Sequence, residues 1–369
     1  MASGRWDLSA LAPREKRTVD LPETGHAFKD GKEYFLNVAF RLRADTAWAE
    51  KGYAVAEDQL LVREGRRGLA PVAGGKAEVA EADGMVTMRA GGTVAVFSRA
   101  SGMLERLEMG GRTILSGPKS GPRVTCVRAF TDSDKWMREP FMKAGLSQLR
   151  YSTEKVRVET SGGTARFCVD LAVDAPLDRG FSHRAAWTLA GDGTLSLESE
   201  TAPWGSMPTL PRFGLSLRLD DALENMEWYG RGPDENYVDR NKGTFVGRYR
   251  STVTDQYVPY TRPQDNGYKS DVREVSFLDA EGRGVTISAD RPLFVQALRH
   301  TWADIYGSRH FNAERGRFLP LVPRREVCLN LDILQTGLGM SSCGPRPTVQ
   351  VRAAPEKWTV VFRPAVPRP

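Results

Sequence analysis

The residues with the clearest chemical potential lie in three short clusters, the first of which is Arg128, Asp132 and Asp134. Two carboxylates two positions apart beside an arginine could orient the hydroxyl groups of a ligand or a neighbouring loop. The same residue types also form ion-paired turns that hold two parts of a chain together, and we favour that interpretation. Trp136 follows closely, and its indole ring could either stack on a ligand or pack in the core.

The second cluster is one continuous stretch, Trp228-Tyr229-Gly230-Arg231-Gly232-Pro233-Asp234-Glu235-Asn236-Tyr237-Val238-Asp239-Arg240. Its glycines and proline predict a tight turn after a strand over 227–229, formed by Gly230, Gly232 and Pro233. They are not a dinucleotide-binding fingerprint, because a third glycine and a following helix are lacking. The polar residues predict a buried network that fixes the loop, with ligand contact as the alternative; they are Glu235, Asn236, Asp239 and Arg240.

The third cluster is the loop Ser342-Cys343-Gly344-Pro345, which contains one of the four cysteines. The others are Cys126, Cys168 and Cys328, and none has C-x-x-C spacing. The four histidines are dispersed along the chain. We therefore predict neither a metal site nor a disulfide framework.

Composition and charge narrow the class of protein. The 369 residues are 40% hydrophobic and 27% charged, which is typical of a soluble globular protein. The net charge is +6, but 52 basic residues are interleaved with 46 acidic ones and form no basic face. Neither a signal peptide nor an apolar run of ~18–20 residues is present. We expect a cytoplasmic chain, as written, that binds neither nucleic acid nor membrane.

Short strands and turns must position these clusters. Strands are predicted over 34–42, 165–173 and 213–219, the last from its strict apolar alternation. Gly91-Gly92 predicts a hairpin turn between two further strands. Residues 71–81 are rich in Ala and Gly, which favours a linker. The sequence therefore predicts an all-β protein with domains over 1–70 and 82–365 joined by a linker over 71–81.

Four segments, in the same order, resemble the C-terminal part of the glycoside hydrolase family 2 β-galactosidases. The strongest is the Trp228–Arg240 stretch, continued by Tyr257-Val258-Pro259-Tyr260 and Pro263-Gln264-Asp265-Asn266-Gly267-Tyr268. The other three are Thr46-Ala47-Trp48-Ala49-Glu50-Lys51-Gly52, then Arg128-Ala129-Phe130-Thr131-Asp132-Ser133-Asp134, and finally Leu329-Asn330-Leu331-Asp332 with Gly337-Leu338-Gly339 and Ser342-Cys343-Gly344-Pro345.

The resemblance implies a partial immunoglobulin-like sandwich, the end of the family's fourth domain, followed by a galactose-mutarotase-like supersandwich, its fifth domain or small chain. It also implies hydrolysis of terminal non-reducing β-D-galactosides, such as lactose, with retention. Retention requires two carboxylates ~5–5.5 Å apart. In this family both glutamates lie on a TIM barrel, which takes ~250 residues. Every matched segment follows that barrel, so we expect no catalytic pair here.

The magnesium and sodium ions of the family belong to the barrel domain, so no cofactor is expected in this chain. The expected partners are a β-galactoside and a large chain carrying the barrel, or further copies of this chain. The first strands of the fourth domain have no counterpart here, so we expect either a fragment or a small subunit that docks on a large chain.

The resemblance also bears on single residues. The segment with Arg128, Asp132 and Asp134 would approach the mouth of the active site, where these side chains and Trp136 are candidates for sugar binding. The position at which the family carries a tryptophan that stacks on the sugar corresponds to Gly344, or to Cys343 if the alignment gap shifts by one residue. The resemblance therefore implies that this chain lacks that stacking ring. Two other functions remain open: a free-standing carbohydrate-binding module on the concave face of the sandwich, or an inactive gene remnant.

Overall fold

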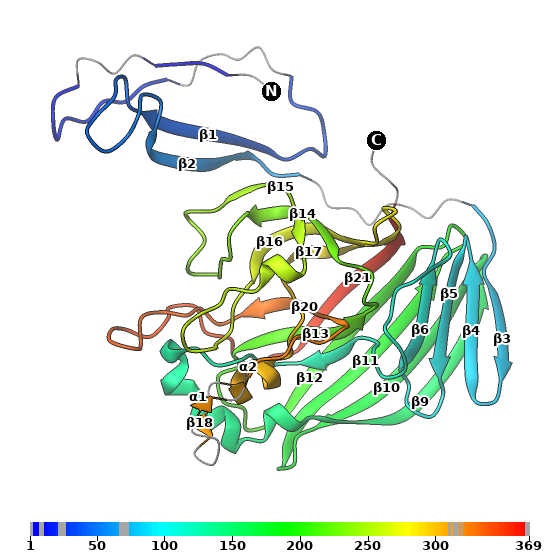
Figure 1. The fold of residues 1–369 in the computed structure, drawn as a ribbon. Helices are drawn as coiled ribbons and strands as arrows, with labels where there is room; N and C mark the ends of the chain where they lie inside the picture. The colour runs from blue at the N-terminus through cyan, green and yellow to red at the C-terminus, as the bar shows by residue number, and fades with distance from the viewer. Residues whose placement is uncertain are drawn as a thin grey trace. The chain divides into compact units, whose positions relative to one another are not determined.

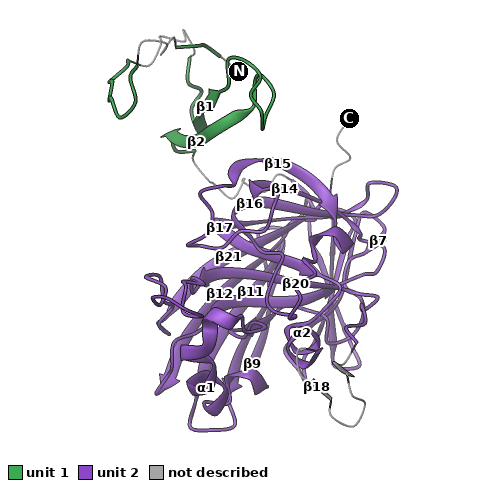
Figure 2. Ribbon diagram, turned by 60° about the vertical axis from the view of Figure 1, so that its left-hand side comes forward, with its two compact units in different colours: residues 1–67 green, residues 68–369 purple. Residues whose placement is uncertain are grey.

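The computed structural model describes residues 3–6, 11–20, 27–65, 74–308, 311–312, 317–318 and 320–365. The chain divides into two compact units, residues 1–67 and 68–369 (Figure 2).

The first unit contains an antiparallel pair of strands, β1 (Tyr34–Arg41) and β2 (Ala54–Arg63). The strand predicted over 34–42 is thus confirmed. The segment that connects β1 to β2 turns at Gly52, whose φ of 91° lies in the left-handed region that favours glycine. The described residues of this unit show this ribbon and no second sheet, so the immunoglobulin-like sandwich stays a prediction.

The described residues of the second unit form a 5-stranded sheet and a 12-stranded sheet (Figure 1). The smaller sheet consists of β3 (Glu78–Ala82), β4 (Met85–Ala90), β5 (Thr93–Ser98), β6 (Leu104–Met109) and β7 (Arg112–Thr113). The larger sheet consists of β8 (Arg123–Thr125), β9 (Arg150–Ser161), β10 (Thr164–Asp174), β11 (Arg179–Leu189), β12 (Leu195–Gly205), β13 (Arg212–Leu219), β14 (Asn225–Gly232), β15 (Phe245–Thr252), β16 (Lys269–Leu278), β17 (Gly284–Leu298), β20 (Val327–Gln335) and β21 (Glu356–Pro364).

The larger sheet runs in the order β15-β14-β16-β17-β21-β12-β11-β10-β9, and β13 pairs with both β20 and β8. The long strand β17 has two partners on one side: Val285–Ala289 pair with β21, and Phe294–Leu298 pair with β20. One continuous strand therefore belongs to both branches of the sheet.

The two sheets pack against each other through aromatic side chains. Phe97 of β5 stacks on Phe167 of β10 with 4.5 Å between ring centroids, and Trp187 of β11 lies 5.6 Å from Phe97. All three side chains are buried. Figure 1 shows β3–β6 covering the end of the sheet formed by β9–β11. The predicted all-β fold is confirmed.

The alternating pattern of β13 has the predicted effect. Phe213, Leu215, Leu217 and Leu219 are all buried, while Ser216 and Arg218 on the other face are half-buried. The predicted Gly91-Gly92 hairpin is also present, between β4 and β5.

The predicted linker over 71–81 is wrong in its last part. Glu78–Ala82 form β3, which pairs along its whole length with β4. Small and acidic side chains suffice there, because β3 is the edge of its sheet and its side chains are mostly exposed. Residues 71–73 lie outside the described part of the chain.

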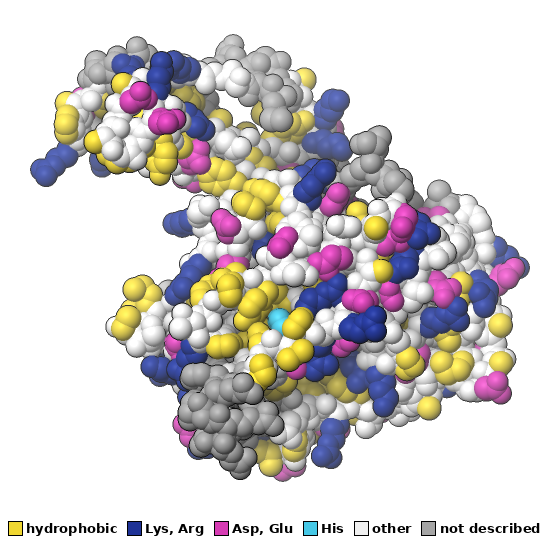
Figure 3. Space-filling view, in the orientation of Figure 1, with side chains coloured by type: hydrophobic (Ala, Val, Ile, Leu, Met, Phe, Trp, Pro, Cys, Tyr) yellow, Lys and Arg dark blue, Asp and Glu magenta, His cyan; other side chains and the backbone are white. Residues whose placement is uncertain are grey.

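Helices are short and serve as connections. They are α1 (Lys135–Lys143) and α2 (Trp302–Ser308), and the small pair β18 (Phe311–Asn312) and β19 (Arg317–Phe318) follows α2. None of the described helices has the length and apolar character needed to cross a membrane. On the face shown in Figure 3, basic and acidic side chains of the second unit are interspersed.

Candidate functional site

Four loops of the second unit enclose a cavity of about 290 Å³. They are residues 131–133 before α1, 235–240 after β14, 260–265 before β16 and 338–342 after β20. Each of these loops includes residues from the motifs identified in the sequence. Segments more than 200 residues apart along the chain thus converge on one small polar site.

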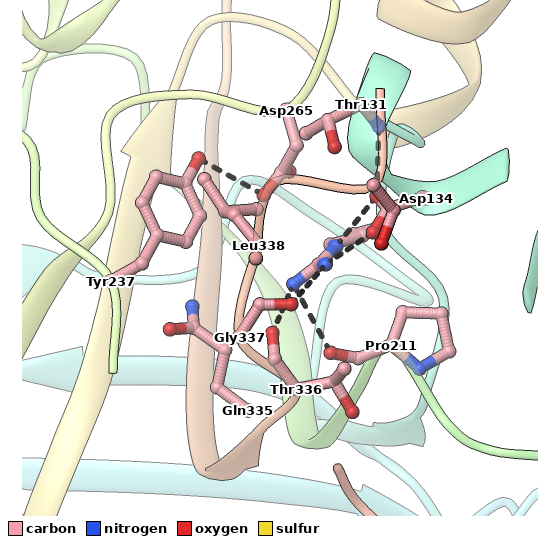
Figure 4. A network of polar contacts seen from close by, with 12 residues as sticks. Thr131, Asp134, Pro211, Tyr237, Asp265, Gln335, Thr336, Gly337 and Leu338 are labelled. Atoms are coloured by element: carbon pink, nitrogen blue, oxygen red, sulfur yellow. Dashed lines mark hydrogen bonds and ion pairs between the residues drawn. The ribbon is translucent and has the colours of Figure 1, made fainter. Parts of the chain in front are cut away.

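Arg128 and Asp134 form the buried support of this site (Figure 4). Arg128 Nη2 lies 2.7 Å from Asp134 Oδ1, and both side chains are at most 1% exposed. Arg128 also donates to the carbonyl oxygens of Thr336 at 2.7 Å and Pro211 at 3.3 Å. Asp134 accepts the backbone N–H of Thr131 at 2.8 Å. These contacts favour the ion-paired turn over sugar binding for both residues.

Asp132 lies on the cavity wall instead. Its side chain is 43% exposed, and Arg262 Nη1 lies 3.3 Å from its Oδ1. The backbone N–H of Asp132 donates to Gln264 Oε1 at 3.2 Å, which ties the loop at 131–133 to the loop at 260–265. Asp132 is therefore the member of the predicted acidic pair that a ligand could reach.

Trp136 is half-buried at the start of α1, and the guanidinium of Arg346 lies over its ring at 5.0 Å. Its indole N–H is buried and has no hydrogen-bond partner among the described residues. Trp136 is not among the described residues that line the cavity. An arginine thus lies over one face of the ring.

Cys343 and Gly344 lie in an exposed turn, in which the N–H of Cys343 donates to the Met340 carbonyl at 3.0 Å. Ser342 of the same turn contributes to the cavity wall. Cys343 is a free thiol. The turn therefore reaches the cavity through Ser342.

The turn predicted at Gly230, Gly232 and Pro233 begins later than expected, because Gly230 lies inside β14 and Gly232 is its last residue; the chain bends at Pro233 and Asp234. A Cβ atom on Gly230 would lie 2.8 Å from Val272 Cα, and one on Gly232 would lie 2.8 Å from Tyr249 Cδ2. The glycines thus allow neighbouring strands and a tyrosine ring to approach closely. Pro233 follows the strand, and the Gly232–Pro233 peptide bond is cis.

The polar residues after β14 do fix their loop, although of the four only Asn236 is buried. Asn236 Oδ1 accepts hydrogen bonds from the backbone N–H and the hydroxyl of Ser270, at 2.7 and 2.6 Å. Asp239 accepts the N–H groups of Leu338 and Gly339 at 3.0 and 2.8 Å.

The remaining two polar residues of this loop act at the rim of the cavity. Arg240 donates to the carbonyl of Gly339. Glu235 accepts the N–H of Gly267 at 2.7 Å and the hydroxyl of Tyr260. The loop is thereby joined to both the 260–267 and the 337–339 segments.

Asp265 is a site residue that local sequence patterns did not single out. Only 4% of it is exposed, and it lines the cavity. Tyr237 donates to its Oδ2 at 3.3 Å and Gln296 donates to its Oδ1 at 3.1 Å. Burial raises the pKa of Asp265 to about 7, against the opposing effect of Arg128. Its position between a proline and a glycine in an otherwise polar stretch was the available signal.

A second buried ion pair joins β13 to β20. Arg212 Nη1 lies 2.6 Å from Asp332 Oδ1, and Tyr268 donates to Asp332 Oδ2 at 2.6 Å. An aspartate in the apolar run of β20 was the sequence signal for this pair. No group of three or more His, Cys, Asp or Glu side chains within the described ranges could hold a metal ion.

Comparison with known proteins shows which family this chain resembles. The profile described as "Beta galactosidase small chain" matches residues 89–363, and the one described as "Beta-galactosidase, domain 4" matches residues 1–63. A beta-galactosidase of Priestia megaterium is 30% identical over 76% of this chain, and one of Vibrio cholerae is 30% identical over 89%.

The chain spans only 27% and 31% of the length of these two relatives. Among solved structures, galactose 1-epimerase from Lactobacillus acidophilus aligns over 79% of this chain and 99% of its own, with 10% identity and a TM-score of 0.35. The profile match over most of the second unit shows that this chain belongs to the beta galactosidase small chain family.

Proposed function

We propose that this chain is the C-terminal part, or the small subunit, of a β-galactosidase that hydrolyses terminal non-reducing β-D-galactosides such as lactose with retention. Its second unit would wall the active site of a TIM barrel that lies on a separate large chain or elsewhere in a longer protein. The chain itself would supply no catalytic carboxylate pair.

The convergence of the family motifs on one cavity carries this proposal. The loops at 131–133, 235–240, 260–265 and 338–342 are separate in sequence but line the same space. Buried ion pairs and backbone-directed hydrogen bonds hold them rigidly. A rigid set of polar loops at one end of a β-scaffold is what a wall of an active site requires.

The first unit supports the idea of a larger assembly. Its strand pair exposes Phe40 and Leu60 at 50% each and Leu61 at 48%. Exposed aromatic and aliphatic side chains gathered on one small unit are characteristic of a surface that another chain or domain covers. The magnesium and sodium ions implied for the family would bind on the barrel domain.

The test measures hydrolysis of a chromogenic β-galactoside by the purified chain, by a large chain with the barrel, and by their mixture. We expect no turnover by this chain alone and a gain on mixing. Turnover by this chain alone would show that the catalytic pair is present here.

A co-elution experiment separates assembly from activity. If the two chains form a complex on size-exclusion chromatography but the mixture is no more active than the large chain, the role of active-site wall is refuted.

A further inference from the structure

One dipeptide of the second unit is chemically unstable by its nature. Asn266-Gly267 is the only place in the sequence where glycine follows asparagine. In such a pair the backbone nitrogen of the glycine can attack the side-chain carbonyl carbon of the asparagine, because a residue without a Cβ atom does not hinder the approach. The amide nitrogen leaves as ammonia, together with the proton of the glycine N–H, and a succinimide ring remains. Water then opens the ring to aspartate or isoaspartate.

The fold nevertheless requires both residues. Gly267 has a φ of 78°, and a Cβ atom there would lie 2.7 Å from the carbonyl oxygen of Gln256. The fully buried side chain of Asn266 uses both ends of its amide. Its Oδ1 accepts the N–H of Val258 at 3.0 Å, and its Nδ2 donates to the carbonyl of Gln264 at 2.8 Å. An ionised aspartate would replace that donor by a second acceptor.

The folded chain opposes the reaction at the attacking nitrogen. The N–H of Gly267 donates to Glu235 Oε2 at 2.7 Å. The nitrogen must lose this proton in order to attack, and its removal beside a carboxylate is unfavourable because two negative charges would adjoin. The other carboxyl oxygen of Glu235 accepts the hydroxyl of Tyr260, which fixes the acceptor in place.

The folded chain also opposes the reaction at the carbon that is attacked. Hydrogen bonds hold the Asn266 amide by opposite ends, so the group cannot rotate toward the Gly267 nitrogen without breaking both. Gln296 Nε2 donates to the backbone carbonyl of Asn266 at 2.6 Å, which fixes the peptide between the two reacting groups. Asn266 is 0% exposed, so the water needed to open a succinimide has no access.

We propose that Asn266-Gly267 is a latent deamidation site, which the hydrogen bond from Gly267 to Glu235 and the clamped Asn266 amide keep unreactive in the folded chain. Opening of this part of the second unit releases the site. The new carboxyl group at position 266 then opposes refolding, because it lacks the donor that the Gln264 carbonyl accepts. Each long-lived opening is thus converted into a permanent loss of folded chain. This inference does not rest on the proposed function.

The experiment incubates the purified full chain at mildly alkaline pH, in buffer and in denaturing guanidinium chloride. Peptide mapping by mass spectrometry follows the conversion of the residue 266 amide to an acid. We expect conversion in denaturant to be at least ~10-fold faster than in buffer, because the folded chain opens only rarely. After dilution from denaturant, size-exclusion chromatography should find the unconverted chain in the folded fraction and the converted chain outside it.

Two variants test the role of Glu235. Glu235→Ala removes the acceptor of the Gly267 N–H, and should speed conversion in buffer about tenfold or more, because a hydrogen bond to a charged group contributes at least that factor to keeping the site closed. Glu235→Gln keeps an acceptor oxygen without the charge, and its rate should lie between the two. The control is Glu198→Ala, the same change at an exposed position of β12, which should leave the rate unaltered.

Three results would overturn the proposal. The first is an equal rate of conversion in buffer and in denaturant. The second is a Glu235→Ala rate that equals the Glu198→Ala rate, or that rises only as far as a lower free energy of unfolding accounts for. The third is normal refolding of the converted chain. If Glu235→Ala fails to fold, as judged by circular dichroism, Glu235→Gln and the comparison of the unaltered chain in buffer and denaturant decide.

Discussion

Replacing Asp134 by asparagine tests whether the Arg128–Asp134 pair is structural. The carboxylate of Asp134 accepts three hydrogen bonds: from Arg128 Nη2 at 2.7 Å, from Arg128 Nε at 3.2 Å, and from the Thr131 N–H at 2.8 Å. Asp134→Asn keeps the shape of the side chain but leaves the guanidinium buried without its counter-charge. Removing one partner of a buried pair costs about 3–5 kcal/mol. We expect that loss in the free energy of unfolding.

The matched control is Asp170→Asn, which removes the same charge from a surface pair. Asp170 lies 3.3 Å from Arg184, and these side chains are 26% and 61% exposed. Exposed pairs contribute about 0–1 kcal/mol. The control should therefore shift the urea midpoint only slightly.

The assay is urea unfolding followed by tryptophan fluorescence and near-ultraviolet circular dichroism. The chain has two units, so coincidence of the two transitions must be established before a two-state free energy is calculated. If the free energy of unfolding of Asp134→Asn lies within about 1 kcal/mol of that of the unaltered chain, with an unchanged m-value, the pair does not stabilise the fold and our interpretation is refuted.

Three further predictions follow from the same structure. Gly230→Ala should destabilise the second unit by about 1–3 kcal/mol, because the new methyl group would lie 2.8 Å from Val272 Cα. The control is Gly243→Ala, which should be tolerated because a Cβ atom there would have no neighbour within 4 Å. Thermal unfolding of the two variants tests this difference. Burial raises the pKa of Asp265 from 3.8 to about 7, so the folded chain binds this proton more tightly than the unfolded chain. Its contribution to the free energy of unfolding is therefore full below pH 3.8 and falls by roughly 4 kcal/mol as the pH rises to about 7. Urea unfolding at several pH values should show that Asp265→Asn removes this pH dependence. Burial lowers the pKa of His183 from 6.5 to about 4, so its contribution is full above pH 6.5 and declines as pH falls toward 4; the NMR titration of its ring protons should have a midpoint well below 6.5.

Much of the fold could be predicted because its determinants are local. Alternating apolar residues gave β13 its buried face, and adjacent glycines marked the β4–β5 hairpin. The same local logic failed at Gly230 and Gly232, where the glycines accommodate close contacts with residues 272 and 249. A glycine required for tertiary contact looks the same in sequence as one required for a turn.

The candidate site was predictable to a similar degree. The motifs contained every loop of the cavity, and the polar residues after β14 anchor their loop as expected. The role of Asp265 could not be predicted, because its partners Tyr237 and Gln296 lie 28 and 31 residues away. Its burial arises only when three loops and β17 assemble. Similarly, nothing in the local sequence indicates that Arg346 covers Trp136.

The position of β21 has a consequence for how the protein is made. This strand follows all the others in sequence, yet it lies between β12 and β17 and pairs with both. Synthesis proceeds from the N-terminus, so the nascent chain presents the unpaired edge of β12 while more than 150 residues are still to be translated. An unpaired edge is a template for association with other chains. The sheet closes only when residues 356–364 have left the ribosome, so the edge of β12 benefits from chaperone protection until then.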